Sequence, residues 1–185
     1  MNAKTKQNTD EVKGKAAPTA SADRTTLTVP YWLLKDSHCK KLGKRSEGGI
    51  KYQLLAGDDK ATLYIRVTAN ESGGYFSKEL VPFTGIEQCL EKCAEASSFP
   101  SKTFRDAFVG RSTNNAGFLA AILREEGLLE AAQEEEFQHV LAADIAAWKT
   151  AALARQGTQI AIADPNGMAA FATQGRQTLS VPNKP

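Results

Sequence analysis

The stretch from Ile50 to Val81 restricts the fold most strongly, because it alternates apolar and polar residues around two turn sequences. Turn-forming residues occupy positions 57–60 (GDDK) and 70–74 (NESGG), and β-branched and aromatic residues flank both. These residue types tolerate positive φ or hydrogen-bond to their own backbone, as hairpin turns require. The stretch therefore predicts three antiparallel strands joined by tight turns.

Alternation also predicts which side chains share a face, since neighbours in a strand point to opposite sides of the sheet. Leu63, Ile65 and Val67 are the apolar set of the middle strand and are expected to face the core. In the third strand we expect Phe76 and Leu80 to point inward, because Phe is the larger apolar side chain. The opposite face is then polar and carries Lys51, Gln53, Thr62, Tyr64, Arg66, Thr68, Tyr75 and Ser77.

The flanking segments extend these strands to a β-β-β-β-α layout. Residues 26–34 (TLTVPYWLL) predict a first strand, and Pro30 places it at an edge or a bend because proline has no N–H to donate. Residues 84–97 predict a helix, whose apolar side chains recur at helical spacing: Ile86, Cys89, Leu90 and Cys93. The layout of residues 26–97 resembles the small single-strand-binding domains of the transcriptional-coactivator and Whirly type, and this resemblance implies a single-strand-binding fold.

Helical spacing dominates the second half of the chain. It predicts a short helix over 101–108, a second helix over 112–126 and a long amphipathic helix over 128–155. The apolar face of the long helix contains Phe137, Leu141, Ile145 and Trp148. The fold class predicted from the sequence is therefore α+β, with an antiparallel sheet of about four strands and a mostly helical C-terminal half.

Length and composition predict one globular domain with unstructured ends. The 185 residues are 42% hydrophobic and 24% charged, which suffices for one sizeable core over residues 25–157. Residues 1–24 and 174–185 are predicted to be disordered tails, because they cannot bury enough apolar surface to offset their ordering entropy. Residues 158–173 contain the turn sequence DPNG and are either a final hairpin or a segment ordered by a partner.

Charge is unevenly distributed along the chain. Residues 1–84 contain 14 Lys or Arg against 9 Asp or Glu, whereas residues 85–185 contain 9 against 12. The most basic stretch is 35–45 (KDSHCKKLGKR), which we expect to be a loop or short helix leading into the polar sheet face. A basic loop beside exposed aromatics is typical of proteins that bind single strands, where cations contact phosphates and aromatics stack on bases.

The leading hypothesis is thus a non-enzymatic nucleic-acid-binding accessory protein, with single-stranded DNA or RNA favoured. The expected phosphate contacts are Lys40, Lys41, Lys44, Arg45, Lys51 and Arg66. The expected stacking platforms are Tyr64 and Tyr75.

Two alternatives stay open. The first is an adaptor or inhibitor that acts by protein contact through its C-terminal helices, including a homodimer through the helix around Phe137 to Trp148. The second is a helix-turn-helix DNA-binding regulator, in which the two helices of 101–126 form the motif and Asn114 and Asn115 open the recognition helix.

Sequence motifs give no indication of catalysis. The chain lacks the P-loop, nucleophile-elbow and HExxH patterns, and its two histidines stand in no catalytic constellation. We therefore predict no enzymatic activity, no metal site and no cofactor. Cys39, Cys89 and Cys93 are too few for a disulfide framework, which favours a reducing compartment. Because no stretch reaches the ~20 apolar residues of a membrane span and no signal sequence is evident, a cytoplasmic protein is expected.

Overall fold

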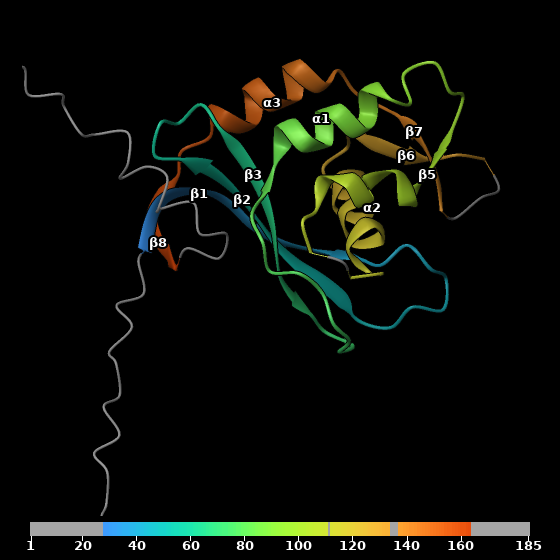
Figure 1. Ribbon diagram of the computed structural model, residues 1–185, viewed down its shortest axis with the longest axis horizontal. Helices are drawn as coiled ribbons and strands as arrows, with labels where there is room; N and C mark the ends of the chain where they lie inside the picture. Colours follow the sequence, from blue (N-terminus) through green and yellow to red (C-terminus); the bar gives the residue numbers. More distant parts are fainter. Residues whose placement is uncertain (1–27, 111, 134–136, 164–185) are drawn as a thin grey trace, which may run out of the picture.

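The computed structural model describes residues 28–110, 112–133 and 137–163. Within these ranges the chain forms two antiparallel sheets and three α-helices, so the α+β class is confirmed at this coarse level (Figure 1). The segments 1–24 and 174–185, predicted as tails, and the second half of the predicted 158–173 hairpin lie outside the described residues. Within the described ranges, no helix is both long and apolar enough to span a bilayer.

A five-stranded sheet, in the order β4-β3-β2-β1-β8, is the central layer. Every neighbouring pair in it is antiparallel. Its strands are β1 (Thr28–Lys40), β2 (Gly49–Gly57), β3 (Leu63–Asn70), β4 (Val81–Pro82) and β8 (Thr158–Ala163).

The β2–β3 hairpin forms as its alternation predicted. Gly57 N–H donates to Thr62 O at 2.8 Å and Lys60 N–H donates to Gly57 O at 2.9 Å, which closes the turn. The Asp59 carboxylate accepts from the backbone N–H groups of Ala61 and Thr62, at 2.9 and 3.0 Å. Asp59 therefore acts as a turn residue, satisfying its own backbone as Asp commonly does.

The helices α1 (Phe83–Glu91), α2 (Asn115–Glu125) and α3 (Ile145–Leu153) lie on one side of this sheet (Figure 1). A 3-10 helix, η1 (Ser101–Ala107), precedes α2. A second sheet, in the order β5-β7-β6, consists of β5 (Phe99–Pro100), β6 (Leu129–Ala131) and β7 (Gln138–Leu141). The main core lies between the five-stranded sheet and the helices and includes Leu54, Ile65, Phe83, Ile86, Leu119 and Ile122.

The opposite face of the sheet carries a second, smaller apolar cluster. Tyr31, Leu55, Leu80 and Ile162 are buried in it. Phe76, in contrast, packs against the main core. The expectation that Phe76 and Leu80 share the inner face was therefore wrong, because the chain between them does not keep a strand's alternation.

Residues 75–80 do not form the predicted third strand; only Val81 and Pro82 pair with β3. The backbone of this segment bonds to side chains at the start of α2 instead. Tyr75 O accepts from Ser112 Oγ and Asn114 Nδ2, both at 2.9 Å, and Ser77 N–H donates to Asn115 Oδ1 at 3.0 Å. Hydrogen bonds to side chains almost 40 residues away thus take the place of the predicted backbone pairing with β3.

The first strand is longer than predicted, and the basic loop is correspondingly shorter. β1 continues to Lys40, so half of the 35–45 stretch is strand and only residues 41–48 connect β1 to β2. β1 is also an interior strand, flanked by β2 and β8, and not an edge. Pro30 is accommodated because β2 pairing begins only at Tyr31, which lies opposite Gly57.

The prediction of a mostly helical C-terminal half was wrong. Residues 128–155 form β6, β7 and the nine-residue α3 in place of one long helix. Ala132 N–H donates to Gln138 O at 3.0 Å, which closes the β6–β7 hairpin. Phe137 and Leu141 follow a four-residue spacing that fits a helix, yet both side chains are largely exposed. The spacing was coincidental and did not mark a buried face.

Candidate nucleic-acid interface

The β1–β2 loop turns toward the helical layer and away from the outer sheet face. Leu42 packs against the main core. Lys41 Nζ lies 5.8 Å from the Phe118 ring centroid, donates to Glu47 O at 3.2 Å and also contacts Ser72 Oγ. Lys44 and Arg45 follow in the loop and are exposed. The loop is thus held against α2 and the β3–β4 connection.

Two adjoining cavities open beside this loop, with volumes of about 360 and 490 Å³. Both are lined by Gly43, Ser46 and Phe137. We call the combined depression the loop hollow. Its wall residues come from the loop, the β3–β4 connection, the start of α2 and the residue before β7: Lys41, Gly43, Lys44, Arg45, Ser46, Asn70, Ser72, Thr113, Asn114 and Phe137. Among the residues that the structure describes, none that lines the hollow is acidic.

Two aromatic side chains near the hollow are exposed although their backbones are fixed. Phe137 is 56% exposed, and its carbonyl oxygen accepts from Ser101 N–H at 3.0 Å. Tyr75 is 79% exposed, and its carbonyl accepts from the hollow-lining Asn114. An exposed ring on an anchored backbone loses little conformational entropy on binding, which favours stacking.

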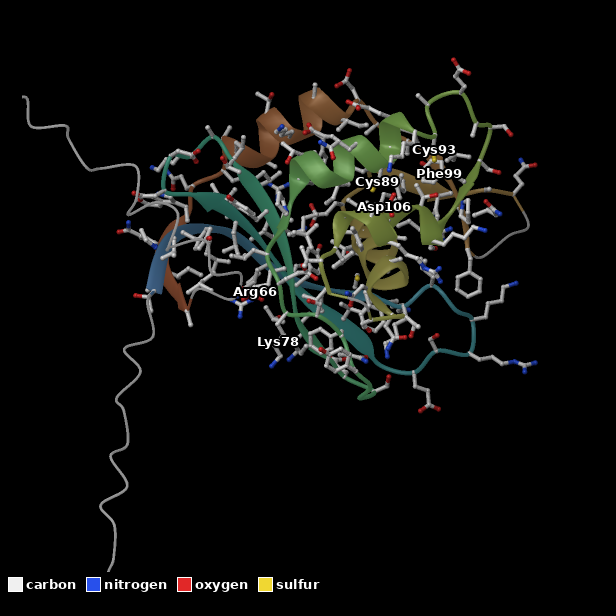
Figure 2. All side chains as sticks on the ribbon, viewed as in Figure 1. Arg66, Lys78, Cys89, Cys93, Phe99 and Asp106 are labelled. Carbon is white, nitrogen blue, oxygen red and sulfur yellow. The ribbon has the colours of Figure 1, made fainter. Side chains whose placement is uncertain are left out.

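A second cationic group lies on the outer face of the five-stranded sheet. Figure 2 shows Arg66 and Lys78 on the side of β3 away from α1. Lys51 in β2 pairs with His38 in β1, and by strand alternation both side chains point to this outer face. We call Lys40, Lys51, Arg66 and Lys78 the sheet patch. Asp36, an acidic residue of β1 two positions from His38, accepts a hydrogen bond from Gln53 Nε2 at 2.8 Å.

Seven of the eight predicted site residues therefore separate into two groups. Lys41, Lys44 and Arg45 line the loop hollow and Tyr75 is bonded to its lining residue Asn114, whereas Lys40, Lys51 and Arg66 belong to the sheet patch. Tyr64 belongs with neither, because it packs edge-on against Tyr31 at a ring distance of 5.6 Å beside the outer apolar cluster.

Burial, and to a lesser extent the charge of Asp59, raises the pKa of the Tyr64 phenol. Along β3, Tyr64 is also six residues from Asn70, where the connection to Tyr75 starts, which is a distance of about 20 Å. The two tyrosines predicted to stack together thus lie in different surroundings, Tyr64 against Tyr31 and Tyr75 next to Asn114.

A Ser-His pair lies behind Phe137, although its hydrogen bonds do not suit nucleophilic catalysis. His139 is buried, and Ser101 Oγ lies 2.7 Å from its Nε2. Arg124 Nε donates to His139 Nδ1 at 2.9 Å, so Nδ1 accepts and the ring proton is on Nε2. Nε2 then donates to Ser101 and cannot take its proton. Burial, aided by the Arg124 charge, lowers the pKa of His139 to about 4.

A buried carboxylate closes α2. The Glu126 side chain is only 2% exposed and accepts from Lys35 Nζ at 2.7 Å and from the Tyr52 hydroxyl at 2.5 Å. Arg155 Nη2 lies 3.8 Å from its other oxygen. Burial and the hydrogen bond to Glu126 raise the pKa of Tyr52, so the phenol stays protonated and donates. These contacts join β1, β2, α2 and the end of α3.

The cysteines do not form a metal site with their neighbours. Cys89 lies in α1 and Cys93 two residues after its end, and Figure 2 shows both in the region of Phe99 and Asp106. Within the described ranges, no group of three His, Cys, Asp or Glu side chains lies close enough to hold a metal ion. Burial raises the pKa of Cys89, and burial with the charges of Glu125 and Glu126 raises that of Cys39 to about 12. Both thiols are protonated at neutral pH.

Comparison with known proteins gives no relative: no family model, no curated protein and no solved structure matches the chain. The candidate interface therefore rests on geometry. Sequence reasoning missed Phe137, because its spacing assigned it to a helix face, and missed the burial of Glu126 and His139. The triple glutamate before Phe137 was a usable signal, since such charge density is unfavourable on the buried side of a helix.

Proposed function

We propose that this protein binds single-stranded nucleic acid in the loop hollow, with Lys44, Arg45 and Lys41 on phosphates and a base stacked on Phe137. One observation carries the proposal: an aromatic ring that is 56% exposed lines the same depression as three cations of the β1–β2 loop. This combination supplies both elements of sequence-tolerant single-strand binding, a cationic wall and a stacking platform.

Single strands are favoured over duplexes for a steric reason. Phe137 can stack only on a base whose face is accessible, and the bases of a duplex are already stacked on one another. The hollow is also concave and local, whereas a duplex offers a convex surface of phosphates. Each stacked base contributes roughly 1 to 3 kcal/mol, and phosphate contacts add a salt-dependent part.

The sheet patch extends the surface available to a longer strand. Lys40 ends β1 directly before Lys41 of the hollow, so the two cationic groups meet at this end of the sheet. A strand that leaves the hollow past Lys40 then reaches Lys51 and Arg66. We assign these residues a secondary role, because the sheet patch offers no exposed aromatic of its own among the described residues.

Acidic residues oppose this binding and make it testable. Three glutamates, at 134–136, directly precede Phe137 in the sequence. Their charge repels phosphates at short range but is screened by salt within a Debye length of about 8 to 10 Å. Changing all three to Gln should therefore strengthen binding at low salt, and this gain should shrink as salt rises.

The test is a fluorescence-anisotropy titration of labelled single- and double-stranded oligonucleotides at about 50 and 200 mM salt. We expect single strands to bind more tightly, with a logarithmic salt slope near −2 for three phosphate contacts at about −0.7 each. Lys44→Glu with Arg45→Glu should abolish most binding, whereas Lys60→Glu with Lys92→Glu, neither of which lines the hollow, should change it far less. Absence of binding at low salt would refute the proposal.

The alternatives receive less support from the geometry. The protein-contact hypothesis, with its homodimer, was based on one long helix, whereas Trp148 stacks on Phe83 at 5.2 Å within the same chain. In the helix-turn-helix hypothesis Asn115 would contact bases, yet Asn115 is buried and its amide bonds to Ser77 N–H and Gly110 O. A cytoplasmic location stays a prediction.

A further inference from the structure

A separate cavity of about 390 Å³ lies at the other end of the five-stranded sheet, beside the β2–β3 turn. Its walls come from β1, β2 and the connection between α3 and β8. Leu34, Ala56 and Leu153 supply apolar surface, while Trp32, Lys60 and Arg155 supply the donors that the argument uses. The volume falls within the range of small-molecule sites, which is roughly 300 to 1,000 Å³.

Lys60 has a backbone conformation that a lysine rarely adopts. Its φ is +53°, and it is the one non-glycine residue with positive φ among those the structure describes. Glycine or asparagine would occupy this position of the turn with less strain. The Lys60 ammonium lies 3.7 Å from the Trp32 ring centroid, at the cavity wall. A strained residue that places a charge in a cavity is a reason to look for a ligand.

The indole of Trp32 has a buried donor without an acceptor. Its Nε1 is inaccessible to solvent and makes no hydrogen bond. A buried donor in this state costs free energy, and an acceptor in the cavity can reach it only after a neighbouring side chain moves. The indole of Trp148 offers the internal contrast, because its Nε1 donates to Glu126 O at 3.0 Å.

Positive charge in this cavity is not balanced by a lining carboxylate. Within the described ranges, no acidic residue lines it. Arg155 faces the buried Glu126 only across 3.8 Å, and a guanidinium has five N–H donors, so several can still reach the cavity. The cavity wall is closely packed at Gly157, where a Cβ would lie 3.0 Å from Leu34 Cδ2 and 3.1 Å from Leu33 O.

From these observations we propose that the cavity binds a small carboxylate with an apolar body, such as an aryl-acetate. Lys60 and Arg155 hold the carboxylate beside the Trp32 ring, and the body packs on Leu34 and Leu153. The inference is independent of nucleic-acid binding, because no residue of the loop hollow or the sheet patch takes part.

The test uses the full chain, labelled with ¹⁵N, and phenylacetate as the probe. The indole N–H resonances of Trp32 and Trp148 are assigned from Trp32→Phe and Trp148→Phe variants. We expect phenylacetate to shift the Trp32 resonance saturably and to leave that of Trp148 in place. Phenylacetamide, which is neutral, and inorganic phosphate, which lacks the apolar body, should bind at least about tenfold more weakly.

Lys60→Asn is the decisive variant, because asparagine tolerates the turn conformation while removing the cation. It and Arg155→Gln should each weaken phenylacetate binding about tenfold or more, whereas Lys102→Gln on η1 should not. The proposal is overturned if phenylacetate leaves the Trp32 resonance unmoved at millimolar concentration. Equal binding of the amide, tighter binding of phosphate, or full binding by folded Lys60→Asn would overturn it as well.

Discussion

The helical layer and the loop hollow use the same charged and aromatic residue types in opposite ways. In the helical layer and the second sheet beside it, Glu126, His139 and Trp148 are bonded to partners within the chain. At the hollow, Arg45 and Phe137 point into solvent beside a depression. A structural residue therefore cannot be told from a binding residue by its type. It can be told by whether its side chain is buried and hydrogen-bonded within the chain. Variants in the layer should change stability alone, and variants in the hollow should change binding alone.

The largest expected effect is that of Glu126→Ala on folding. The change leaves the Tyr52 hydroxyl without its acceptor and removes the counter-charge of Lys35. We expect a loss of about 3 kcal/mol in the free energy of unfolding. The loss is not larger because the Lys35 ammonium is partly exposed and can be hydrated by water once its counter-charge is gone. Chemical denaturation measures it, with the exposed neighbour Glu125→Ala as the control at about 0.5 kcal/mol or less. Equal losses of stability in the two variants would show that the buried Glu126 contributes no more to folding than the exposed Glu125.

Phe137→Ala should act on binding and not on folding. Losing one stacked base costs about 1 to 3 kcal/mol, or roughly 5- to 150-fold in affinity for a single strand. Val109→Ala is the matched control, because Val109 is a 90% exposed apolar side chain that does not line the hollow. A Phe137→Ala protein that binds normally but unfolds more easily would show that the ring is structural and would contradict the comparison.

Acidification should weaken the helical layer through His139. Its pKa is about 4 in the folded chain, below the ordinary 6.5, so between these values the unfolded chain takes up a proton that the native chain does not. Stability therefore falls as pH drops from 6.5 toward 4, by at most about 1.4 kcal/mol per pH unit. His139→Gln should flatten this slope in urea titrations between pH 6.5 and 5, whereas His38→Asn, at an exposed strand position, should retain it.

The smallest expected effect is that of the sheet patch. Lys51→Gln with Arg66→Gln should weaken binding only about two- to fivefold and reduce the salt slope by less than the loop variants do. Long oligonucleotides should show the loss and short ones should not, because only a longer strand reaches past Lys40. A loss as large as that of the loop variants would move the principal site to the sheet face.

Local pattern predicted the parts of the fold that are held by local contacts. The alternation through Leu63 and Val67 and the turn residues around Asp59 were sufficient for the β2–β3 hairpin. The prediction failed at 75–80, where the backbone is hydrogen-bonded to Ser112, Asn114 and Asn115. The alternation of residues within a segment carries no information about partners so distant in the sequence. The same limit applies at β8, which pairs with β1 more than 100 residues earlier.

The candidate site was predicted in its basic half and missed in its aromatic half. Lys41, Lys44 and Arg45 stood out because consecutive charges are visible in a sequence. Phe137 did not stand out, because its four-residue spacing to Leu141 fits the face of a helix. The sequence does not show that Phe137 instead lies just before a strand. Which ring a loop meets depends on tertiary packing, and Tyr64, chosen for its strand parity, was instead packed against Tyr31.

Amide chemical-shift mapping with an unlabelled single-stranded oligonucleotide tests the central claim most directly. We expect the shifts to concentrate at residues 43–46, 113–117 and 137, and to fade on addition of salt. Shifts confined to the outer face of β2 and β3, or no shifts at low salt, would contradict a binding site in the loop hollow.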